Sequence, residues 1–207
     1  VPTMDRIMSV LEIFQAASEL HAFEFFSDLA LEKVIERAEL KPPLSERCAY
    51  YALLECKHES DHDEQALLRA FERCLEEGLA LDGVMSQGRA QAASLWRYRE
   101  DISESITAFT PYKNDVSVTV GRVPAFLDDV DRAVREAYPD WEIVWFGHIG
   151  DGNLHLNILR PDDLSVTEFK TKCDAVTPTI YEIVKHHDGS VSAEHGVGLL
   201  KKDYLLY

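Results

Sequence analysis

Apolar and polar positions along the chain switch repeatedly between helical and strand-like spacing. Apolar residues recur at helical spacing in segments that predict amphipathic helices over residues 5–20, 29–38, 63–77, 91–106, 126–137 and 166–186. Shorter apolar or alternating runs predict strands at residues 22–26, 49–56, 81–85 and 116–120. A short helix is also expected after Ser192. This order of elements favours an α+β fold with ferredoxin-like split-βαβ halves, in which helices cover one face of a mainly antiparallel sheet.

A stretch that contains two histidines gives the strongest local signal. Apolar runs at 143–146 and 154–159 flank Gly150-Asp151-Gly152-Asn153, whose residues tolerate positive φ, so a tight hairpin is predicted. If the hairpin is symmetric about the middle of that turn, His148 lies directly opposite His155, with Cβ atoms about 4.5–5.5 Å apart. Two imidazoles at that separation can bind one metal ion. The alternative is a pair of ordinary half-buried strand histidines.

Two further residues extend this candidate site. Asn157 follows His155 by two positions and therefore projects from the same face of the strand. Glu194, in the segment Ser192-Ala193-Glu194-His195, offers a carboxylate as a third metal ligand. Taken alone, a carboxylate at that position is better explained as an acid in the first turn of a helix capped by Ser192. Two histidines with one carboxylate leave coordination positions open, which is typical of catalytic metal sites.

Cationic candidates precede the hairpin. Arg99 and Ser103 lie four residues apart on the predicted helix 91–106 and face the same way. Lys113 stands just ahead of the predicted strand 116–120. Arg99 can bind a carboxylate in a bidentate manner. A solvated helix face with mixed charges is the alternative interpretation.

Composition narrows the classes of function. The net charge of −16 argues against a nucleic-acid or anionic-membrane surface, because both need basic patches. The four cysteines form no C-x-x-C motif, so reduced thiols in the cytoplasm or the mitochondrial matrix are expected. No apolar run is long enough for a membrane span, no signal peptide is evident, and no G-x-G-x-x-G loop follows a strand.

Two runs carry a resemblance to a known family. Residues 146–157 (FGHIGDGNLHLN) and 190–198 (SVSAEHGVG) resemble the C-terminal domain of FAD-linked oxidases, flavoproteins that oxidise D-2-hydroxy acids. The resemblance covers nearly the whole chain, including Trp96-x-x-Arg99-Glu100 and Tyr112-Lys113. It is closest to the members that act on D-2-hydroxyglutarate, with D-lactate next. It implies that residues 1–207 form a substrate- and metal-binding domain, and that the FAD-binding domain and a final C-terminal segment lie outside this piece.

The resemblance also implies a role for each candidate residue. By it, the metal ligands are His148, His155 and Glu194, and the metal is expected to be Zn²⁺. His195 corresponds to the catalytic base. The substrate contacts are Arg99, Ser103, Lys113 and Asn157, with Ser103 standing where close relatives carry Thr.

The implied activity is oxidation of a D-2-hydroxy acid to the 2-oxo acid with hydride transfer to FAD, which the other domain would bind. The isolated chain is therefore expected to be inactive. The partners implied are the 2-hydroxy acid and an electron acceptor such as electron-transfer flavoprotein or a quinone. Two alternatives are a metal-dependent hydrolase, which would use a zinc-bound water, and a non-catalytic ferredoxin-like metal-binding sensor domain. His148, His155 and Glu194 have neither the H-E-x-x-H nor the H-x-x-E-H spacing, which argues against the hydrolase.

Overall fold

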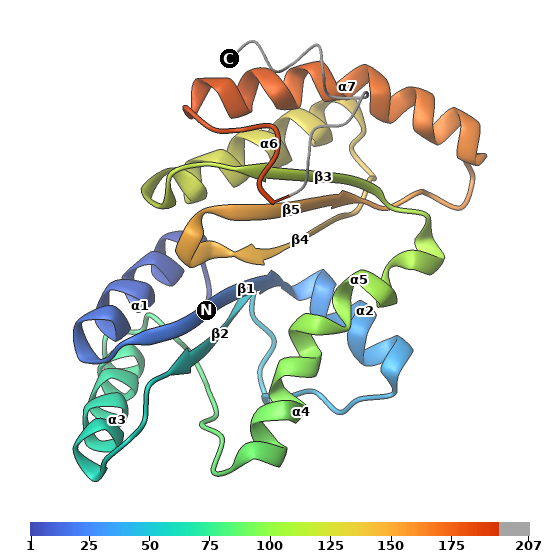
Figure 1. Cartoon of the computed structure of the whole chain (residues 1–207). Coiled ribbons are helices and arrows are strands. Elements are labelled where there is room, and N and C mark those ends of the chain that lie inside the picture. The colour runs from blue at the N-terminus through green and yellow to red at the C-terminus, as the bar shows by residue number, and fades with distance from the viewer. Residues whose placement is uncertain (195–207) are drawn as a thin grey trace. The chain divides into compact units, whose positions relative to one another are not determined.

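The computed structural model describes residues 1–194 of the chain. The chain divides into two compact units, Val1–Ile102 and Ser103–Tyr207. Both units combine helices with antiparallel strands (Figure 1). The α+β prediction is therefore confirmed.

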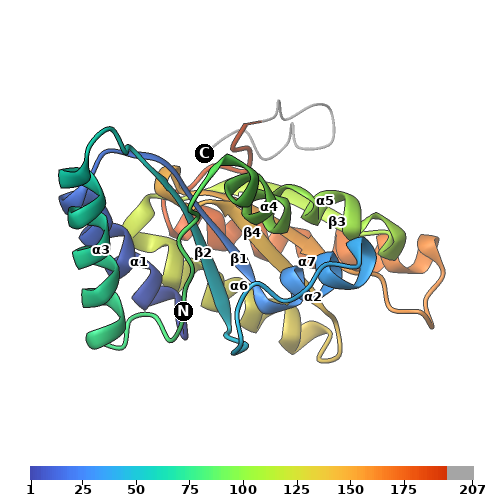
Figure 2. The same ribbon diagram turned by 90° about the horizontal axis from the view of Figure 1, so that it is seen from below.

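In unit 1, helices α1 (Met4–Ala17) and α3 (Asp61–Glu76) pack side by side (Figure 2). Each helix begins after a hydroxyl residue, Thr3 or Ser60, whose side chain accepts a hydrogen bond from a backbone N–H of the first turn. Ile7 and the other apolar residues at helical spacing on α1 are buried. The amphipathic pattern of the sequence thus becomes a packed helix pair.

The strands of unit 1 are β1 (Leu20–Ser27) and β2 (Tyr50–Cys56), which pair antiparallel. Helix α2 (Asp28–Ala38) connects to β1 directly, because Ser27 ends the strand and caps the helix. Helix α4 (Arg89–Glu100) packs against both strands. Its contact with β1 buries the charged side chain of Arg99.

Unit 2 follows the order strand, helix, strand, strand, helix. These elements are β3 (Tyr112–Ser117), α6 (Val123–Ala137), β4 (Ile143–His148), β5 (Asn153–Ile158) and α7 (Val166–His186). Shorter helical segments are α5 (Ile102–Ser105) and the 3₁₀ turns Thr107–Phe109, Val120–Arg122 and Ile149–Asp151. The strands lie in the order β4–β5–β3, and all neighbours are antiparallel.

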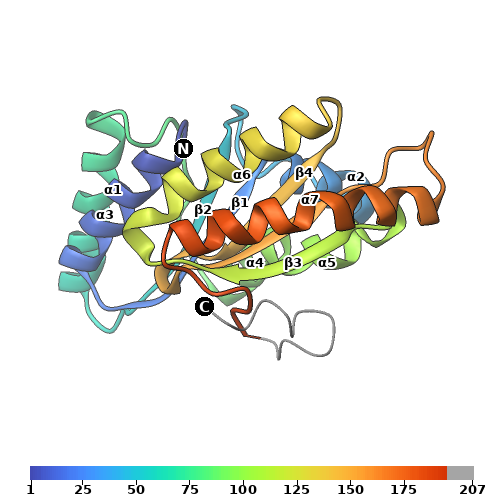
Figure 3. The same ribbon diagram turned by 90° about the horizontal axis from the view of Figure 1, so that it is seen from above.

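An isolated antiparallel bridge, Ser117 to Ser190, lies on the side of β3 that faces away from β5. It stands where a ferredoxin-like unit has its fourth strand, so unit 2 has the predicted split-βαβ arrangement. Helices α6 and α7 lie side by side over one face of this sheet (Figure 3). Trp145 and Leu156 belong to the face beneath them, and Trp145 Nε1 donates a hydrogen bond to Asp131 of α6.

The two faces of the unit 2 sheet differ in chemistry because strand side chains alternate. On the helix side, burial raises the pKa of Tyr112 to about 12, and its hydroxyl donates to Asp174 of α7. The other face carries most of the polar residues of the three strands. We call it the polar face, and it consists of Lys113, Asp115, Ser117, Val144, Phe146, His148, Asn153, His155 and Asn157.

Two predicted elements need correction. The strand predicted at 81–85 is wrong: Leu81 and Val84 are 56% and 43% exposed, and the segment is not in a sheet. The helix predicted at 91–106 is interrupted at Asp101, between α4 and α5. By contrast, α7 occupies the predicted range 166–186, because Ser165 closes a capping box at its start.

Within residues 1–194, no helix is long and apolar enough to cross a membrane.

Candidate active site

The two histidines lie on adjacent antiparallel strands, as predicted, but in a different register. His148 pairs with Asn153, and His155 pairs with Phe146. The prediction that His148 and His155 are direct partners is therefore wrong. The difference preserves the alternation of the strand, so both rings still project from the polar face, with centroids 5.9 Å apart and planes at 79°.

The cause of the register is the turn itself. Ile149–Asp151 forms a 3₁₀ turn, and Gly152 closes it in the left-handed region at φ +73°. A Cβ at Gly152 would overlap the carbonyl oxygen of Val118, whose N–H in turn donates to the Gly152 carbonyl. The turn thus starts one residue earlier than in the predicted hairpin, which was centred between Asp151 and Gly152.

The segment that carries Glu194 is held along the side of β3 that faces away from β5. Ser117 and Ser190 exchange two backbone hydrogen bonds, of 3.0 and 2.7 Å. Gly189 allows this close approach, because a Cβ there would overlap the Ser117 carbonyl oxygen. Residues 192–194 are not helical, so the expected helix start at Ser192 is not found within the described residues.

This segment brings Glu194 to the histidines. Glu194 Oε1 lies 3.4 Å from His148 Nε2 and accepts a hydrogen bond of 3.3 Å from Asn153 Nδ2. The Glu194 backbone N–H donates to Asp115 Oδ2 at 3.2 Å. A carboxylate from a distant part of the chain and two imidazoles therefore meet on the polar face.

Asp115 belongs to this cluster, and the sequence analysis missed it. Its Oδ1 lies 3.1 Å from His155 Nδ1, and the two residues are direct partners between β3 and β5. The strand was expected to begin at 116 because Lys113-Asn114-Asp115 are residues depleted in strands. Alternation of polar Asp115 and Ser117 with apolar Val116 and Val118 was the signal that could have extended the strand to position 115.

The predicted substrate contacts Lys113 and Asn157 are also direct partners between β3 and β5. Lys113 is exposed, whereas Asn157 is 2% exposed. Asn157 Nδ2 donates to the backbone carbonyl of His155 at 3.3 Å. Both side chains project from the polar face, two residues away from the His155–Asp115 pair along the strands.

The other predicted contacts are distributed differently. Arg99 lies in unit 1, where its Nε donates to Glu24 Oε2 of β1 at 2.9 Å. Both side chains are buried, at 8% and 4% exposure of the residues. Ser103 begins unit 2 and is exposed on α5. His195, the predicted base, lies outside the described residues.

No group of three or more His, Cys, Asp or Glu side chains within residues 1–194 is already arranged to hold a metal ion. The donor chemistry nevertheless suits one, since two imidazoles and a carboxylate form the ligand set of many open zinc sites. The His155 ring also has a carboxylate at Nδ1, which leaves Nε2 as its ligand atom. His148, His155 and Glu194 therefore fit a divalent metal by chemistry and proximity, once their side chains turn toward a common point.

Comparison with known proteins places this chain in a family. The chain is 55% identical to D-2-hydroxyglutarate dehydrogenase of Stutzerimonas stutzeri over 206 residues, which cover all of this chain and 44% of that protein. It is 48% identical to the enzyme of the same name from Xanthomonas citri, over 99% of the chain and 43% of the relative. A putative mitochondrial D-lactate dehydrogenase of Schizosaccharomyces pombe is 34% identical, over 91% of the chain and 37% of the relative. The chain thus spans less than half the length of these relatives.

The family model described as FAD linked oxidases, C-terminal domain, matches residues 1–207. This match agrees with the resemblance seen in the two motif runs around the histidines and Glu194. The chain belongs to the family of FAD-linked oxidase C-terminal domains.

Proposed function

We propose that this chain is the substrate- and metal-binding domain of an FAD-dependent dehydrogenase that oxidises a D-2-hydroxy acid, with D-2-hydroxyglutarate favoured and D-lactate next. The observation that carries the proposal is the polar face of unit 2. There His148, His155 and Glu194 meet beside Lys113 and Asn157. The relatives of this chain named D-2-hydroxyglutarate dehydrogenase support the same substrate class.

The preference for a dicarboxylic substrate rests on the cationic residues. D-2-Hydroxyglutarate has a carboxylate at each end, whereas D-lactate has one. On the polar face, Lys113 supplies a positive charge and its partner Asn157 supplies an amide, and together these groups suit one carboxylate. Arg99 and the hydroxyl of Ser103 are proposed to contact the substrate as well. The guanidinium of Arg99 is already held through Nε by Glu24, which suits a fixed carboxylate clamp.

The chemistry follows from these residues. His148, His155 and Glu194 would hold a divalent metal, most simply Zn²⁺, which supplies Lewis-acid polarisation of the substrate's C2 hydroxyl. His195 takes the hydroxyl proton as general base. FAD, bound by another domain, supplies the acceptor for the hydride from C2. Electron-transfer flavoprotein or a quinone remains the expected acceptor of the electrons that follow.

The first test assays the full-length protein with D-2-hydroxyglutarate, D-lactate and an ester, using an acceptor dye and a metal analysis of the purified protein. We expect dye reduction with the hydroxy acids, a divalent metal near one equivalent, and loss of activity on chelation. Ester hydrolysis without dye reduction would indicate a hydrolase instead. Metal binding without any turnover would indicate a sensor domain.

A second test separates the ligands from the base. Glu194→Ala is expected to lower metal content and abolish turnover, with partial recovery in excess metal. His195→Ala removes a proton acceptor but none of the proposed ligands, so kcat should fall by about 10²–10⁴-fold with metal content unchanged. If His195→Ala loses the metal and Glu194→Ala keeps it, the two assignments are wrong.

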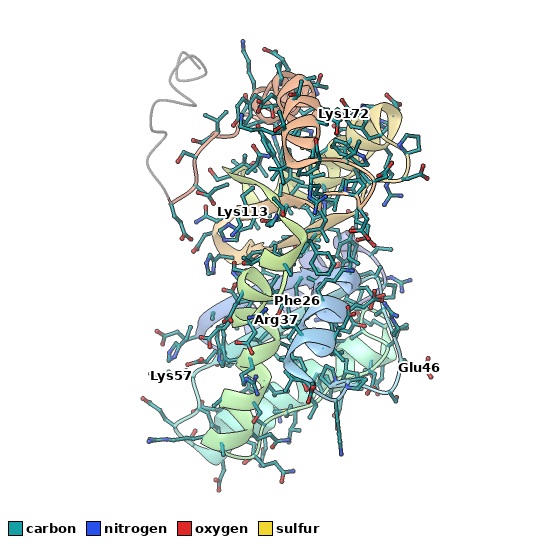
Figure 4. All side chains as sticks on the ribbon, turned by 90° about the vertical axis from the view of Figure 1, so that its right-hand side faces the viewer. Phe26, Arg37, Glu46, Lys57, Lys113 and Lys172 are labelled. Atoms are coloured by element: carbon teal, nitrogen blue, oxygen red, sulfur yellow. The ribbon has the colours of Figure 1, made fainter. Side chains whose placement is uncertain are left out.

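A third test concerns the substrate. Lys113→Ala should raise KM for D-2-hydroxyglutarate and spare D-lactate, if Lys113 binds the distal carboxylate. Lys172→Ala is a matched control, because Lys172 lies on α7 in the helix layer, with its Nζ 5.2 Å from the Tyr138 ring (Figure 4). Equal losses on both substrates would remove the basis for preferring the dicarboxylic acid.

A further inference from the structure

We propose that Asp115 is a positioning residue for the metal site. It contacts two of the three proposed ligands at once. One of its oxygens fixes the His155 ring, and the other holds the backbone that carries Glu194. The proposal rests on the function proposed above, because it concerns ligands of that same site.

The first half of the argument is the contact between Asp115 Oδ1 and His155 Nδ1, at 3.1 Å. The side chains are largely shielded from solvent, at 14% and 18% exposure. A carboxylate oxygen this close to Nδ1 favours the tautomer that carries its proton on Nδ1 and its lone pair on Nε2. Asp115 thus selects the tautomer and the ring orientation in which His155 binds a metal through Nε2, the usual role of a carboxylate behind a metal-ligating histidine.

The second half is the contact between Asp115 Oδ2 and the backbone N–H of Glu194, at 3.2 Å. Upstream, the segment is fixed to β3 by the Ser117–Ser190 bridge. Asp115 is therefore a second attachment point, four residues later, at the residue whose side chain reaches His148. Strand β3 thus supplies none of the three ligands, yet it orients one ligand from β5 and one from the segment after α7.

The chemistry of Asp115 cannot be replaced by its neutral isostere. A carboxylate has two oxygens, and Asp115 places one beside His155 Nδ1 while the other accepts the hydrogen bond from Glu194. An asparagine has one acceptor oxygen, and its amide nitrogen would face an N–H donor at the other contact. Asp115→Asn therefore keeps the size of the side chain but must lose either the histidine contact or the Glu194 contact.

The test measures zinc affinity of the full-length protein by competition with a chelator of known affinity. Asp115→Asn is expected to weaken zinc binding by about 10–100-fold, as other losses of carboxylates behind metal ligands do. The Co²⁺-substituted protein should also show a changed visible spectrum, since the geometry of the ligands changes. Asp128→Asn, an identical change on the exposed face of α6, should alter neither quantity and controls for the loss of one negative charge.

Failure of this inference is distinguishable from failure of the proposed function. If the unsubstituted protein binds no zinc, the proposed function fails. If it binds zinc and loses it in His155→Ala, but Asp115→Asn has the affinity and Co²⁺ spectrum of the parent, only the role of Asp115 is wrong. Should Asp115→Asn not fold, the ¹⁵N shifts of His155 in the zinc-loaded parent decide: protonated Nδ1 supports the role of Asp115, and protonated Nε2 overturns it.

Discussion

Removing the carboxylate of Glu24 should destabilise unit 1 far more than removing Glu24 and Arg99 together. Arg99 Nε and Glu24 Oε2 are 2.9 Å apart, and their side chains are only 10% and 5% exposed. At that distance, two opposite charges attract by about 6 kcal/mol at an effective dielectric constant of about 20. Desolvation costs several kcal/mol for each ion, so the intact pair contributes little net stability.

The asymmetry appears when one partner is removed. Glu24→Leu leaves a buried guanidinium without this carboxylate, and breaking such a pair costs about 3–5 kcal/mol. With a urea m-value of about 2 kcal/mol/M, the unfolding midpoint should fall by about 1.5–2.5 M. The double variant Glu24→Leu/Arg99→Met replaces the pair by apolar side chains of similar size. It should recover most of this loss or exceed the parent.

The assay is pulsed hydrogen exchange across a urea series, followed in the peptides that cover β1 and α4. Glu77→Leu is a control that breaks an exposed pair with Arg73 on the same unit, and it should leave the midpoint in place. If Glu24→Leu costs less than about 1 kcal/mol, other groups satisfy the charge of Arg99. The same result would remove the argument that Glu24 fixes Arg99 as a substrate clamp.

Three further predictions concern the turn, the acid stability and the clamp. Gly152→Ala should cost at least about 1–2 kcal/mol in thermal unfolding because φ is +73°, whereas Gly121→Ala, with open space around its Cα, should cost little. The hydrogen bond with His187 lowers the pKa of Asp129, so its stabilisation is present above about pH 4, the unfolded pKa, and is lost as pH falls through the folded pKa. Asp129→Asn should therefore make the free energy of unfolding depend less on pH in the acid range. An unchanged pH dependence would contradict this. Arg99→Lys should raise KM for the hydroxy acid more than it lowers kcat, as steady-state kinetics would show.

The elements that could be predicted from sequence are those whose signal is local. The period of apolar residues and the Ser165 capping signal suffice to locate α7 at both ends. The prediction of a strand at 81–85 failed because a short apolar run does not show whether another strand pairs with it. Leu81 in this segment is exposed. The start of β3 failed for the opposite reason: its polar residues belong to the candidate site, so their composition resembles a loop.

The candidate site shows the same division. His148, His155 and Glu194 were identifiable as residue types that bind metals, and the structure brings them together. Glu24 and Asp115 were not identifiable, because neither stands near its partner in the sequence. Their roles depend on pairing between elements, which a single sequence does not encode locally.

The register of the strands carries information that the hydrophobic pattern cannot. On the polar face, β3 and β5 place a cation opposite an amide, Lys113 with Asn157, and a carboxylate opposite an imidazole, Asp115 with His155. A slip of β3 by two residues along β5 would keep the apolar side chains of both strands on the helix side, yet it would place Lys113 opposite His155. The core would tolerate that slip, and the site would not. The choice between such registers therefore falls to contacts such as the turn at Gly152, and this explains why the face of His148 was predictable while its partner was not.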